Sequence, residues 1–383
     1  MFRVILWDYT GESEACAKGY LKDDVEIIRT LRPDDPDQAE VIMRGDWNFV
    51  LIFENGQREL FNEIFKTMHA LNVSTDNIIF AKDFNSMANN PAAVYALMKP
   101  ETCDQLYRHR NFFNHRRWHK YIAASAEGLH YVGTSADNAV MWTTYTQSQN
   151  HTSDELKLFH ALCKKYYGVD DTSGYFLELG ANIGTSGIYF CKKLAPNLKY
   201  IAFEPDAENF KMLRINTILN DMEDRATLVN LGLGEKFDEQ TMYVNPNNPG
   251  GNSLLKHPHN PFTETITIIP LDAFFAENKI SPAEIKYIWI DTEGFEPQVL
   301  LGAKNLLRQN PAPIFMECNL RSWDDSGRFE DMLSLLSEGY SHFIYIQGNG
   351  KIYPLEALRR IERPNDLRGQ IGDIFLISKG IIG

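Results

Sequence analysis

The second half of the chain alternates short apolar runs with segments of helical patterning. The apolar runs occupy residues 175–179, 200–203, 227–231, 285–290, 314–316, 343–346 and 374–377. Helical patterns follow most of these runs, but none separates the last two. Because strands that alternate with helices form parallel sheets covered on both faces, this order predicts a doubly wound, Rossmann-like α/β sheet with an antiparallel edge strand.

The first hundred residues have a similar but shorter rhythm. Apolar runs at 4–7, 25–28, 49–53 and 78–80 are typical of strands. Between the last two runs, six apolar residues recur at helical spacing, namely Leu60, Phe61, Ile64, Phe65, Met68 and Leu71. The pattern predicts a smaller α/β domain, and we assign it no cofactor because it contains no glycine-rich phosphate loop.

With 383 residues the chain is long enough for two domains. We expect an N-terminal α/β accessory domain at 1–110, a bridging segment at 111–170 with a strand at 130–133 and a helix at 153–167, and a cofactor-binding domain at 171–383. A basic strip at 108–120 is either a solvated helix face or a site for the phosphates of an acceptor. The accessory domain is expected to shape the acceptor cleft or to form a dimer surface.

Composition and charge narrow the range of partners. The formal net charge of −13 argues against nucleic acid, whose phosphates call for a basic face. No apolar run approaches the ~20 residues that cross a bilayer, so no membrane span is expected. The five cysteines are scattered and form no CxxC pair, which favours a reducing cytoplasm.

The first group of candidate site residues follows the run at 175–179. Glu178 ends this strand, and Gly180 and Gly184 allow the backbone to pass close to a ligand. The remaining expected cofactor contacts of this turn are Asn182, Thr185 and Ser186. A dinucleotide site would have glycine where Asn182 stands, and an acid would repel a pyrophosphate. Carboxylates instead suit S-adenosylmethionine, which carries a sulfonium and an ammonium group.

A second acid follows at the spacing found in nucleotide-binding folds. Glu204 ends the next strand, 204 − 184 = 20 residues after Gly184, and Pro205 follows it. A carboxylate at this position can accept hydrogen bonds from both ribose hydroxyls. Gly232, directly after the run at 227–231, is expected to complete the cofactor site.

A third group of acids follows the run at 285–290. Asp291 and Glu293 lie two residues apart and face the same way while the backbone stays extended. Glu317 ends the next strand and can reach the same crevice, because the carboxyl ends of neighbouring parallel strands meet at one edge of the sheet. Asp291 is also expected to contact the cofactor.

Together these motifs resemble the FkbM family of methyltransferases. The motifs are Glu178–Gly184, Phe203–Asp206, the pair Asn216 and Asn220, Asp291–Glu296 with Leu301–Ala303, and Ile314–Glu317. The resemblance covers roughly residues 173–320 and implies a class I methyltransferase sheet that transfers a methyl group, usually to a hydroxyl of a sugar or natural product. The sequence departs from the family pattern at Trp289, where the family usually has lysine.

Methyl transfer to a hydroxyl requires a base for the hydroxyl proton. We expect Asp291 or Glu293 to be this base, and Glu317 and His257 are the alternative candidates. A divalent cation held by Asp291, Glu293 and Glu317 is an alternative way to acidify the hydroxyl, but nothing in the sequence fixes its ligand number, so no metal is assigned.

The sequence therefore predicts an S-adenosylmethionine-dependent O-methyltransferase that acts on a nucleotide-linked sugar, a polysaccharide or another small molecule. A homo-oligomer is possible. The residues at 247–253 are expected to form a mobile loop over the site. Two alternatives stay open: a nucleotide-dependent oxidoreductase, and a non-catalytic adenosylmethionine- or nucleotide-binding module in glycan assembly.

Overall fold

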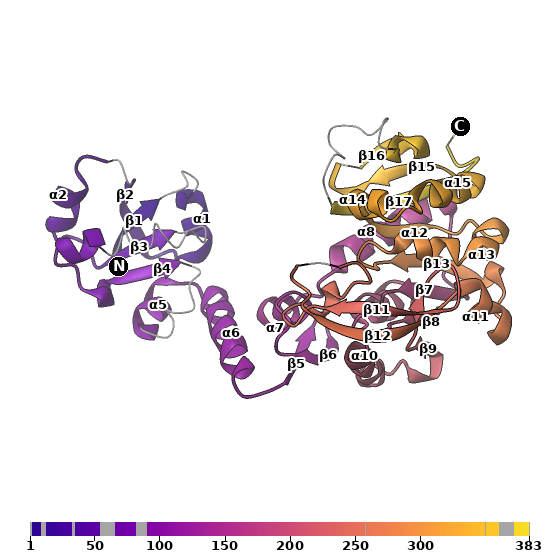
Figure 1. The fold of residues 1–383 in the computed structure, drawn as a ribbon. Helices are drawn as coiled ribbons and strands as arrows, with labels where there is room; N and C mark the ends of the chain where they lie inside the picture. Colours follow the sequence, from indigo (N-terminus) through magenta and orange to yellow (C-terminus); the bar gives the residue numbers. More distant parts are fainter. Residues whose placement is uncertain are drawn as a thin grey trace. The chain divides into compact units, whose positions relative to one another are not determined.

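A computed structural model describes residues 2–8, 13–32, 35–53, 66–81, 90–256, 258–348, 350–359 and 371–382. Residue contacts divide the chain into two compact units, Met1–Trp118 and His119–Gly383 (Figure 1). The bridging segment that the sequence suggested at 111–170 is thus divided: residues 111–118 belong to the first unit and residues 119–170 to the second. No described helix is long and apolar enough to cross a membrane.

The first unit contains a parallel sheet in the order β2-β1-β3-β4. Its strands are β1 (Phe2–Asp8), β2 (Val25–Leu31), β3 (Phe49–Phe53) and β4 (Ile78–Ala81), and its helices include α1 (Ser13–Tyr20), α2 (Gln38–Met43), α5 (Pro91–Leu97) and α6 (Pro100–Arg116). Val4 and Leu6 pack on one face with α1, α5 and α6, while Ile5 and Trp7 pack on the other with α2. All four strands predicted here are confirmed.

Only part of the helix predicted between β3 and β4 can be compared with the structure. Residues 66–70 are helical, and Met68 is buried beneath the sheet. Leu60, Phe61, Ile64 and Phe65 lie outside the described residues.

The second unit is built on an eight-stranded sheet in the order β16-β15-β17-β14-β13-β7-β8-β9. Its strands are β7 (Tyr175–Leu179), β8 (Lys199–Phe203), β9 (Ala226–Val229), β13 (Ile285–Ile290), β14 (Ile314–Asn319), β15 (Tyr340–Tyr345), β16 (Lys351–Pro354) and β17 (Ile371–Ser378). The five strands from β14 to β9 run parallel, and β17 is antiparallel to both β14 and β15. The predicted doubly wound sheet is confirmed. Its antiparallel strand β17 lies third from the edge, and the edge strand β16 is antiparallel to its neighbour β15.

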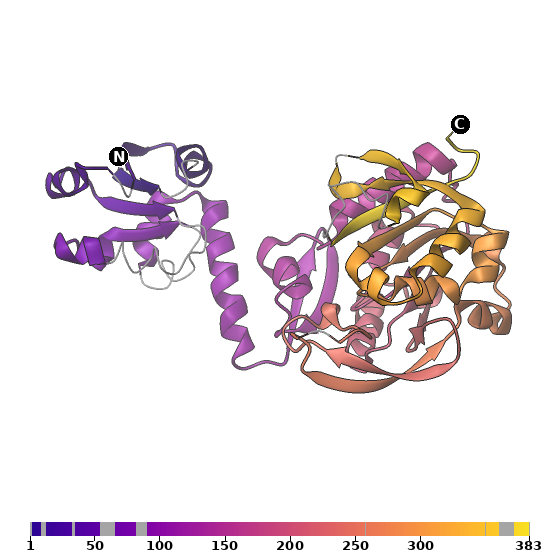
Figure 2. The ribbon, with the colours of Figure 1, turned by 45° about the horizontal axis from the view of Figure 1, so that its top comes forward.

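Helices cover both faces of this sheet (Figures 1 and 2). They include α8 (Ser153–Tyr167), α9 (Thr185–Tyr189), α10 (Ala207–Leu219), α11 (Leu271–Asn278), α12 (Glu296–Leu301), α13 (Lys304–Gln309), α14 (Leu320–Asp325) and α15 (Phe329–Gly339). A hydrophobic core of aliphatic and aromatic side chains joins one face to α11, α12, α13 and α15. On the opposite face, the ring of Phe159 lies within 6.0 Å of Tyr287, Trp289, Phe315 and Phe375.

Two small additions flank the main sheet. The first is a hairpin of β5 (Tyr121–Ala126) and β6 (Leu129–Thr134), followed by α7 (Val140–Gln147). The second is a small sheet of β10 (Gly232–Leu233), β11 (Asp238–Val244) and β12 (Phe262–Ile269), in which β10 is parallel to β12. The sequence predicted only β6 among these strands.

Candidate functional site

A pocket opens at the carboxyl ends of β7, β8 and β13, where three predicted acidic turns meet. Its lining includes nine of the expected cofactor contacts, Glu178, Gly180, Asn182, Thr185, Ser186, Glu204, Pro205, Gly232 and Asp291, together with the expected base Glu293. Gly184 and Glu317 lie beside the lining rather than in it. His257 lies outside the described residues. The fold therefore brings together residues from four separate segments of sequence.

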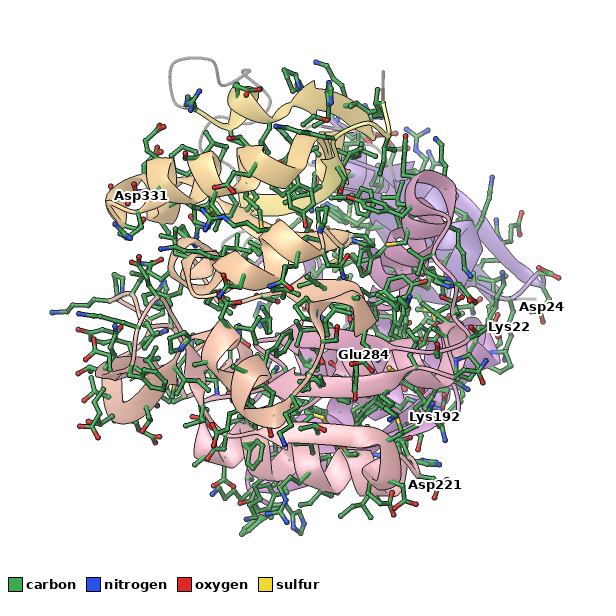
Figure 3. All side chains as sticks on the ribbon, turned by 90° about the vertical axis from the view of Figure 1, so that its right-hand side faces the viewer. Lys22, Asp24, Lys192, Asp221, Glu284 and Asp331 are labelled. Carbon is green, nitrogen blue, oxygen red and sulfur yellow. The ribbon has the colours of Figure 1, made fainter. Side chains whose placement is uncertain are left out.

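Glu178 and Glu204 are almost completely buried at the floor of this pocket, with 1% and 5% of their surfaces exposed. By contrast, Asp221, Glu284 and Asp331 lie at the protein surface (Figure 3). Burial raises the pKa of both Glu178 and Glu204 to about 8, although hydrogen bonds to each carboxylate act in the opposite direction. Ionisation of these two carboxyl groups at neutral pH therefore costs free energy, and a bound cation would reduce that cost.

The hydrogen bonds of the two glutamates differ. Glu178 Oε2 accepts from the backbone N–H of Gly187 at 3.1 Å and from the hydroxyl of Tyr200, so this oxygen is directed into the protein. Glu204 Oε2 accepts from the N–H of Asn182 at 2.7 Å, and Oε1 accepts from the N–H of Asp206 at 2.9 Å. Glu204 therefore fixes the glycine turn after β7 to the end of β8.

The glycine turn depends on close contacts within the protein. Gly180 has φ +90°, and a Cβ at this position would lie 1.8 Å from the carbonyl oxygen of Asp291. Gly180 thus allows the turns after β7 and β13 to touch, whereas its approach to a ligand stays a prediction. Gly187, which the sequence analysis missed, is equally constrained, because a Cβ there would lie 2.1 Å from the Tyr200 ring and 2.5 Å from Glu178 Oε2.

The turn after β13, residues 291–296, is organised around a carboxylate that points away from the pocket. Glu296 is fully buried. Its Oε1 accepts from the N–H and hydroxyl of Thr292 at 2.9 and 2.8 Å and from the N–H of Gly294 at 3.2 Å. Its Oε2 accepts from Trp323 Nε1 at 2.7 Å. These bonds hold Glu293 in a left-handed conformation with φ 52°, facing the pocket.

Carboxyl groups at the ends of two neighbouring strands, β13 and β14, repel one another at this end of the pocket. Asp291 is open to the pocket but lies deep within the protein. Its removal from bulk water and repulsion from Glu293 raise its pKa well above the usual range. Burial, followed by repulsion from Glu296, raises the pKa of Glu293 to about 7. Burial and repulsion from Asp291 raise the pKa of Glu317 to about 10, and its Oε2 has no hydrogen-bond partner among the described residues.

These acids are not arranged as a metal centre. Among the residues that the structure describes, no three His, Cys, Asp or Glu side chains gather as a metal ion would require. The cation that the sequence left open at Asp291, Glu293 and Glu317 therefore has no ready-made ligand set in this part of the chain.

Comparisons with known proteins identify this part of the chain. The family model for the methyltransferase FkbM domain matches residues 178–342, which contain all three acidic turns. The chain carries an FkbM methyltransferase domain. The resemblance read from the motifs is thereby confirmed for residues 178–342. The strand order, with an antiparallel strand between β14 and β15, is that of the class I fold.

Solved structures with similarity to the chain include several methyltransferases. The methyltransferase FkbM from Methylobacillus flagellatus KT is 15% identical with a TM-score of 0.33, and the match covers 88% of this chain and 85% of that one. A putative O-methyltransferase from Klebsiella pneumoniae is 13% identical with a TM-score of 0.33, covering 59% and 80%. An S-adenosylmethionine-dependent O-methyltransferase from Thermotoga maritima is 11% identical with a TM-score of 0.30, covering 58% and 64%. No curated protein matches the chain.

An asparagine-rich loop, residues 245–253, forms one side of the pocket of the FkbM domain. The Asn209 amide donates to the carbonyl of Pro249 at 3.1 Å, and the Asn252 amide donates to Asp206 at 3.1 Å. The Ser253 hydroxyl donates to the carbonyl of Glu293 at 2.9 Å. The loop expected to be mobile is thus hydrogen-bonded to neighbouring elements at its middle and at its C-terminal end.

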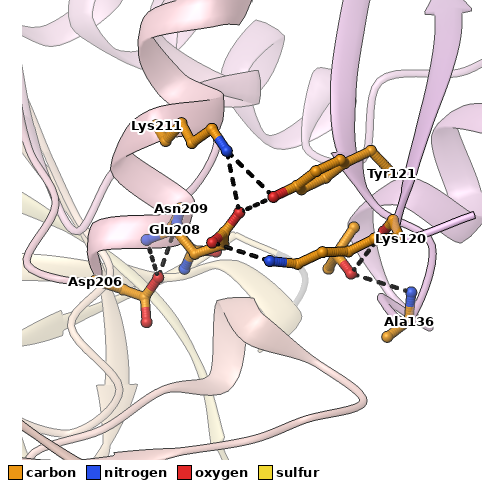
Figure 4. A network of polar contacts seen from close by, with 8 residues as sticks. Lys120, Tyr121, Ala136, Asp206, Glu208, Asn209 and Lys211 are labelled. Atoms are coloured by element: carbon orange, nitrogen blue, oxygen red, sulfur yellow. Dashed lines mark hydrogen bonds and ion pairs between the residues drawn. The ribbon is translucent and has the colours of Figure 1, made fainter.

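The first turn of α10 also binds the β5–β6 hairpin. Figure 4 shows Asp206 and Asn209 at its start, with Glu208 directed the other way. Glu208 accepts from the Tyr121 hydroxyl and pairs with Lys120 at 3.1 Å, at the beginning of β5. The same turn therefore contacts the asparagine-rich loop on one side and the β5–β6 hairpin on the other.

A second wall of the pocket comes from residues before the FkbM domain. Ala139, Val140, His151 and Thr152 line the pocket, and sequence reasoning assigned none of them to it. The Thr152 and Ser186 hydroxyls lie 2.9 Å apart, which joins this wall to the start of α9. The pocket is therefore formed by the FkbM domain together with residues 139–152, which we call the α7 wall.

Proposed function

We propose that the FkbM domain binds S-adenosylmethionine in this pocket and transfers its methyl group to a hydroxyl of a sugar, a nucleotide-linked sugar or another small natural product. One observation carries the proposal: the described lining contains four carboxyl groups, those of Glu178, Glu204, Asp291 and Glu293, and no lysine or arginine. A sulfonium and an ammonium group would stabilise these carboxyl groups in their ionised form, whereas a pyrophosphate would find no cationic side chain in this lining. It supports this cofactor over NAD.

The chemistry of the lining fits the parts of this cofactor. Glu204 retains acceptor capacity on both oxygens, which suits the two ribose hydroxyls. The side-chain oxygen of Asn182 is buried without a partner among the described residues, so it is ready to accept a hydrogen bond from a ligand. Leu231, Leu233 and Met242 offer an apolar surface for a purine ring beside these polar groups.

The acids at the end of β13 would handle the acceptor proton. When bound, the cofactor supplies an electrophilic methyl carbon. Glu293 would take the proton from the acceptor hydroxyl as the new oxygen–carbon bond forms, and a base with a pKa of about 7 is well matched to this task near neutral pH. Asp291 would face the cationic cofactor.

Transfer of labelled methyl groups tests this proposal. The protein would be incubated with labelled adenosylmethionine and a panel of sugars and nucleotide-linked sugars. We expect label in one acceptor class, with the Glu293→Gln variant slower by about 10²- to 10⁴-fold and unchanged in cofactor affinity. Glu277→Gln, which alters an exposed carboxylate on α11, serves as the matched control. A Glu293→Gln variant with the wild-type rate would refute the assignment of the base.

We also propose roles for the features outside the pocket. The first unit would contribute acceptor choice or assembly, and the arginines of the basic strip at 108–120 would bind the phosphates of an acceptor. Cys103, Cys163 and Cys191 are buried thiols outside any disulfide, which supports a reducing compartment such as the cytoplasm.

A further inference from the structure

Two asparagines of α10 bind the outer edge of β6 as a neighbouring strand would. Asn216 accepts from the N–H of Val132 at 2.6 Å and donates to the carbonyl of the same residue at 3.0 Å. Asn220 accepts from the N–H of His130 at 3.0 Å and donates to its carbonyl at 2.7 Å. Both asparagines are buried, with 0% and 4% of their surfaces exposed.

The spacing of the two elements explains why this pairing is possible. Residues four apart on a helix are separated by about 6 Å along its axis, and residues two apart on a strand by about 6.6 Å. The spacing between Asn216 and Asn220 therefore matches the spacing between Val132 and His130, so each asparagine lies opposite one strand residue. Without them, the edge of β6 that faces away from β5 would leave four backbone groups unpaired, which is costly when buried.

The same asparagines lie next to the cofactor turn. The Asn216 amide also donates to the carbonyl of Ile183 at 2.8 Å, in the middle of the glycine turn. From β6 the chain continues through α7 to Asn150, whose amide donates to the carbonyl of Thr185 at 2.9 Å and to the Tyr131 hydroxyl at 3.1 Å. The hairpin, the α7 wall and the glycine turn are thus joined by buried asparagine side chains.

We propose that Asn216 and Asn220 are positioning residues that hold the α7 wall against the end of the pocket that receives the amino-acid part of the cofactor. The wall lines the pocket at Ala139, Val140, His151 and Thr152, and the Thr152 hydroxyl lies 2.9 Å from that of Ser186 in the first turn of α9. The proposal places the amino-acid part of the cofactor beside this contact. The proposal rests on the proposed function for the identity of the ligand. The attachment itself does not depend on it.

Hydrogen exchange tests the attachment in the full-length protein. In Asn216→Ala the amide of Val132 should lose protection by about ten-fold or more, and in Asn220→Ala the amide of His130 should do so. The matched control is Asn310→Ala, because Asn310 also donates to two carbonyls, at 2.7 and 2.9 Å, but at the opposite end of β13. Unchanged exchange at both amides would overturn the proposal. Asn220 ends α10, so its variant serves if Asn216→Ala does not fold.

Ligand affinities test the functional part. Calorimetry would compare adenosylmethionine with methylthioadenosine, which lacks the amino-acid part. The α10 variants should weaken adenosylmethionine by about ten-fold and leave methylthioadenosine unchanged, whereas Asn310→Ala should alter neither. Equal losses for both ligands would overturn the positioning role. If the wild type binds neither ligand, the proposed function fails, while the exchange result still decides the attachment.

Discussion

Replacing Glu204 with glutamine tests the cofactor site with little change in shape. The carboxylate is buried at the end of β8, and each of its oxygens accepts one backbone N–H, from Asn182 or Asp206. Glutamine keeps one of these hydrogen bonds and turns an NH₂ group towards the other N–H. Alanine would leave both N–H groups unpaired and would confuse a loss of binding with a loss of folding.

The expected magnitude follows from the hydrogen bonds that the carboxylate would make to the ribose. Hydrogen bonds to a charged group contribute about 1.5 to 3 kcal/mol, which corresponds to a Kd for adenosylmethionine raised by about 10- to 150-fold. Calorimetric titration of wild-type and variant protein at fixed pH and salt measures this ratio directly. Thermal unfolding of the same samples shows whether the variant is folded at the temperature of the titration.

Glu223→Gln provides the control, because Glu223 is exposed between α10 and β9 and lies outside the pocket. It should bind adenosylmethionine as the wild type does. A folded Glu204→Gln protein with unchanged affinity would show that this carboxylate does not contact the ligand, and the assignment of the ribose site would be wrong.

Three further predictions concern stability and domain structure. Because folding raises the pKa of Glu178 and Glu204 from near 4.5 to about 8, the free energy of unfolding should fall as the pH rises from about 4.5 to about 8. The fall should be less steep in Glu204→Gln. Denaturant titrations that show no pH dependence in this range would contradict the cost of burying the two carboxylates. Gly180→Ala should destabilise the protein by more than about 2 kcal/mol. The control Gly327→Ala, at a glycine with a similar positive φ but open space around it, should cost only about 1 kcal/mol. Equal melting temperatures for the two variants would count against the close contact between Gly180 and the carbonyl of Asp291. A truncated protein that starts at His119 should still bind adenosylmethionine in calorimetry, and a folded fragment that cannot bind would show that the first unit completes the pocket.

The sheet of the second unit was predictable because its strands are buried on both faces. Strands such as β7 and β13 are continuous apolar runs, so their ends were visible as the points where acids and glycines begin. Parallel connectivity then requires the acids at Glu178, Glu204 and Asp291 to meet at one edge. This reasoning needs only local patterns and one rule of topology.

The hairpin of β11 and β12 could not be predicted in the same way. Most of the side chains in β12 are exposed, and only Ile266 and Ile268 are buried. With so few apolar positions, the alternation that identifies a strand is too weak to detect. The hairpin is stabilised by pairing between distant segments, which a local pattern does not record.

The α7 wall escaped prediction for a different reason. Its attachment depends on Asn216 and Asn220, which lie 84 and 90 positions from their partners in β6. Both asparagines belong to the motifs that carry the family resemblance, but the sequence pattern predicted no structural role for them. An asparagine that binds a backbone edge has the same local signature as one on a solvated helix face, so only burial in the folded chain distinguishes the two.

The central claim is that the pocket binds a cationic adenosyl cofactor rather than a dinucleotide. Calorimetric titration of the full-length protein with adenosylmethionine, adenosylhomocysteine and NAD tests it most directly. The account predicts saturable binding of the first two ligands, which share the adenosyl and amino-acid groups, and no binding of NAD at the same concentrations, because four carboxyl groups line the site. Binding of NAD with no binding of adenosylmethionine would contradict it.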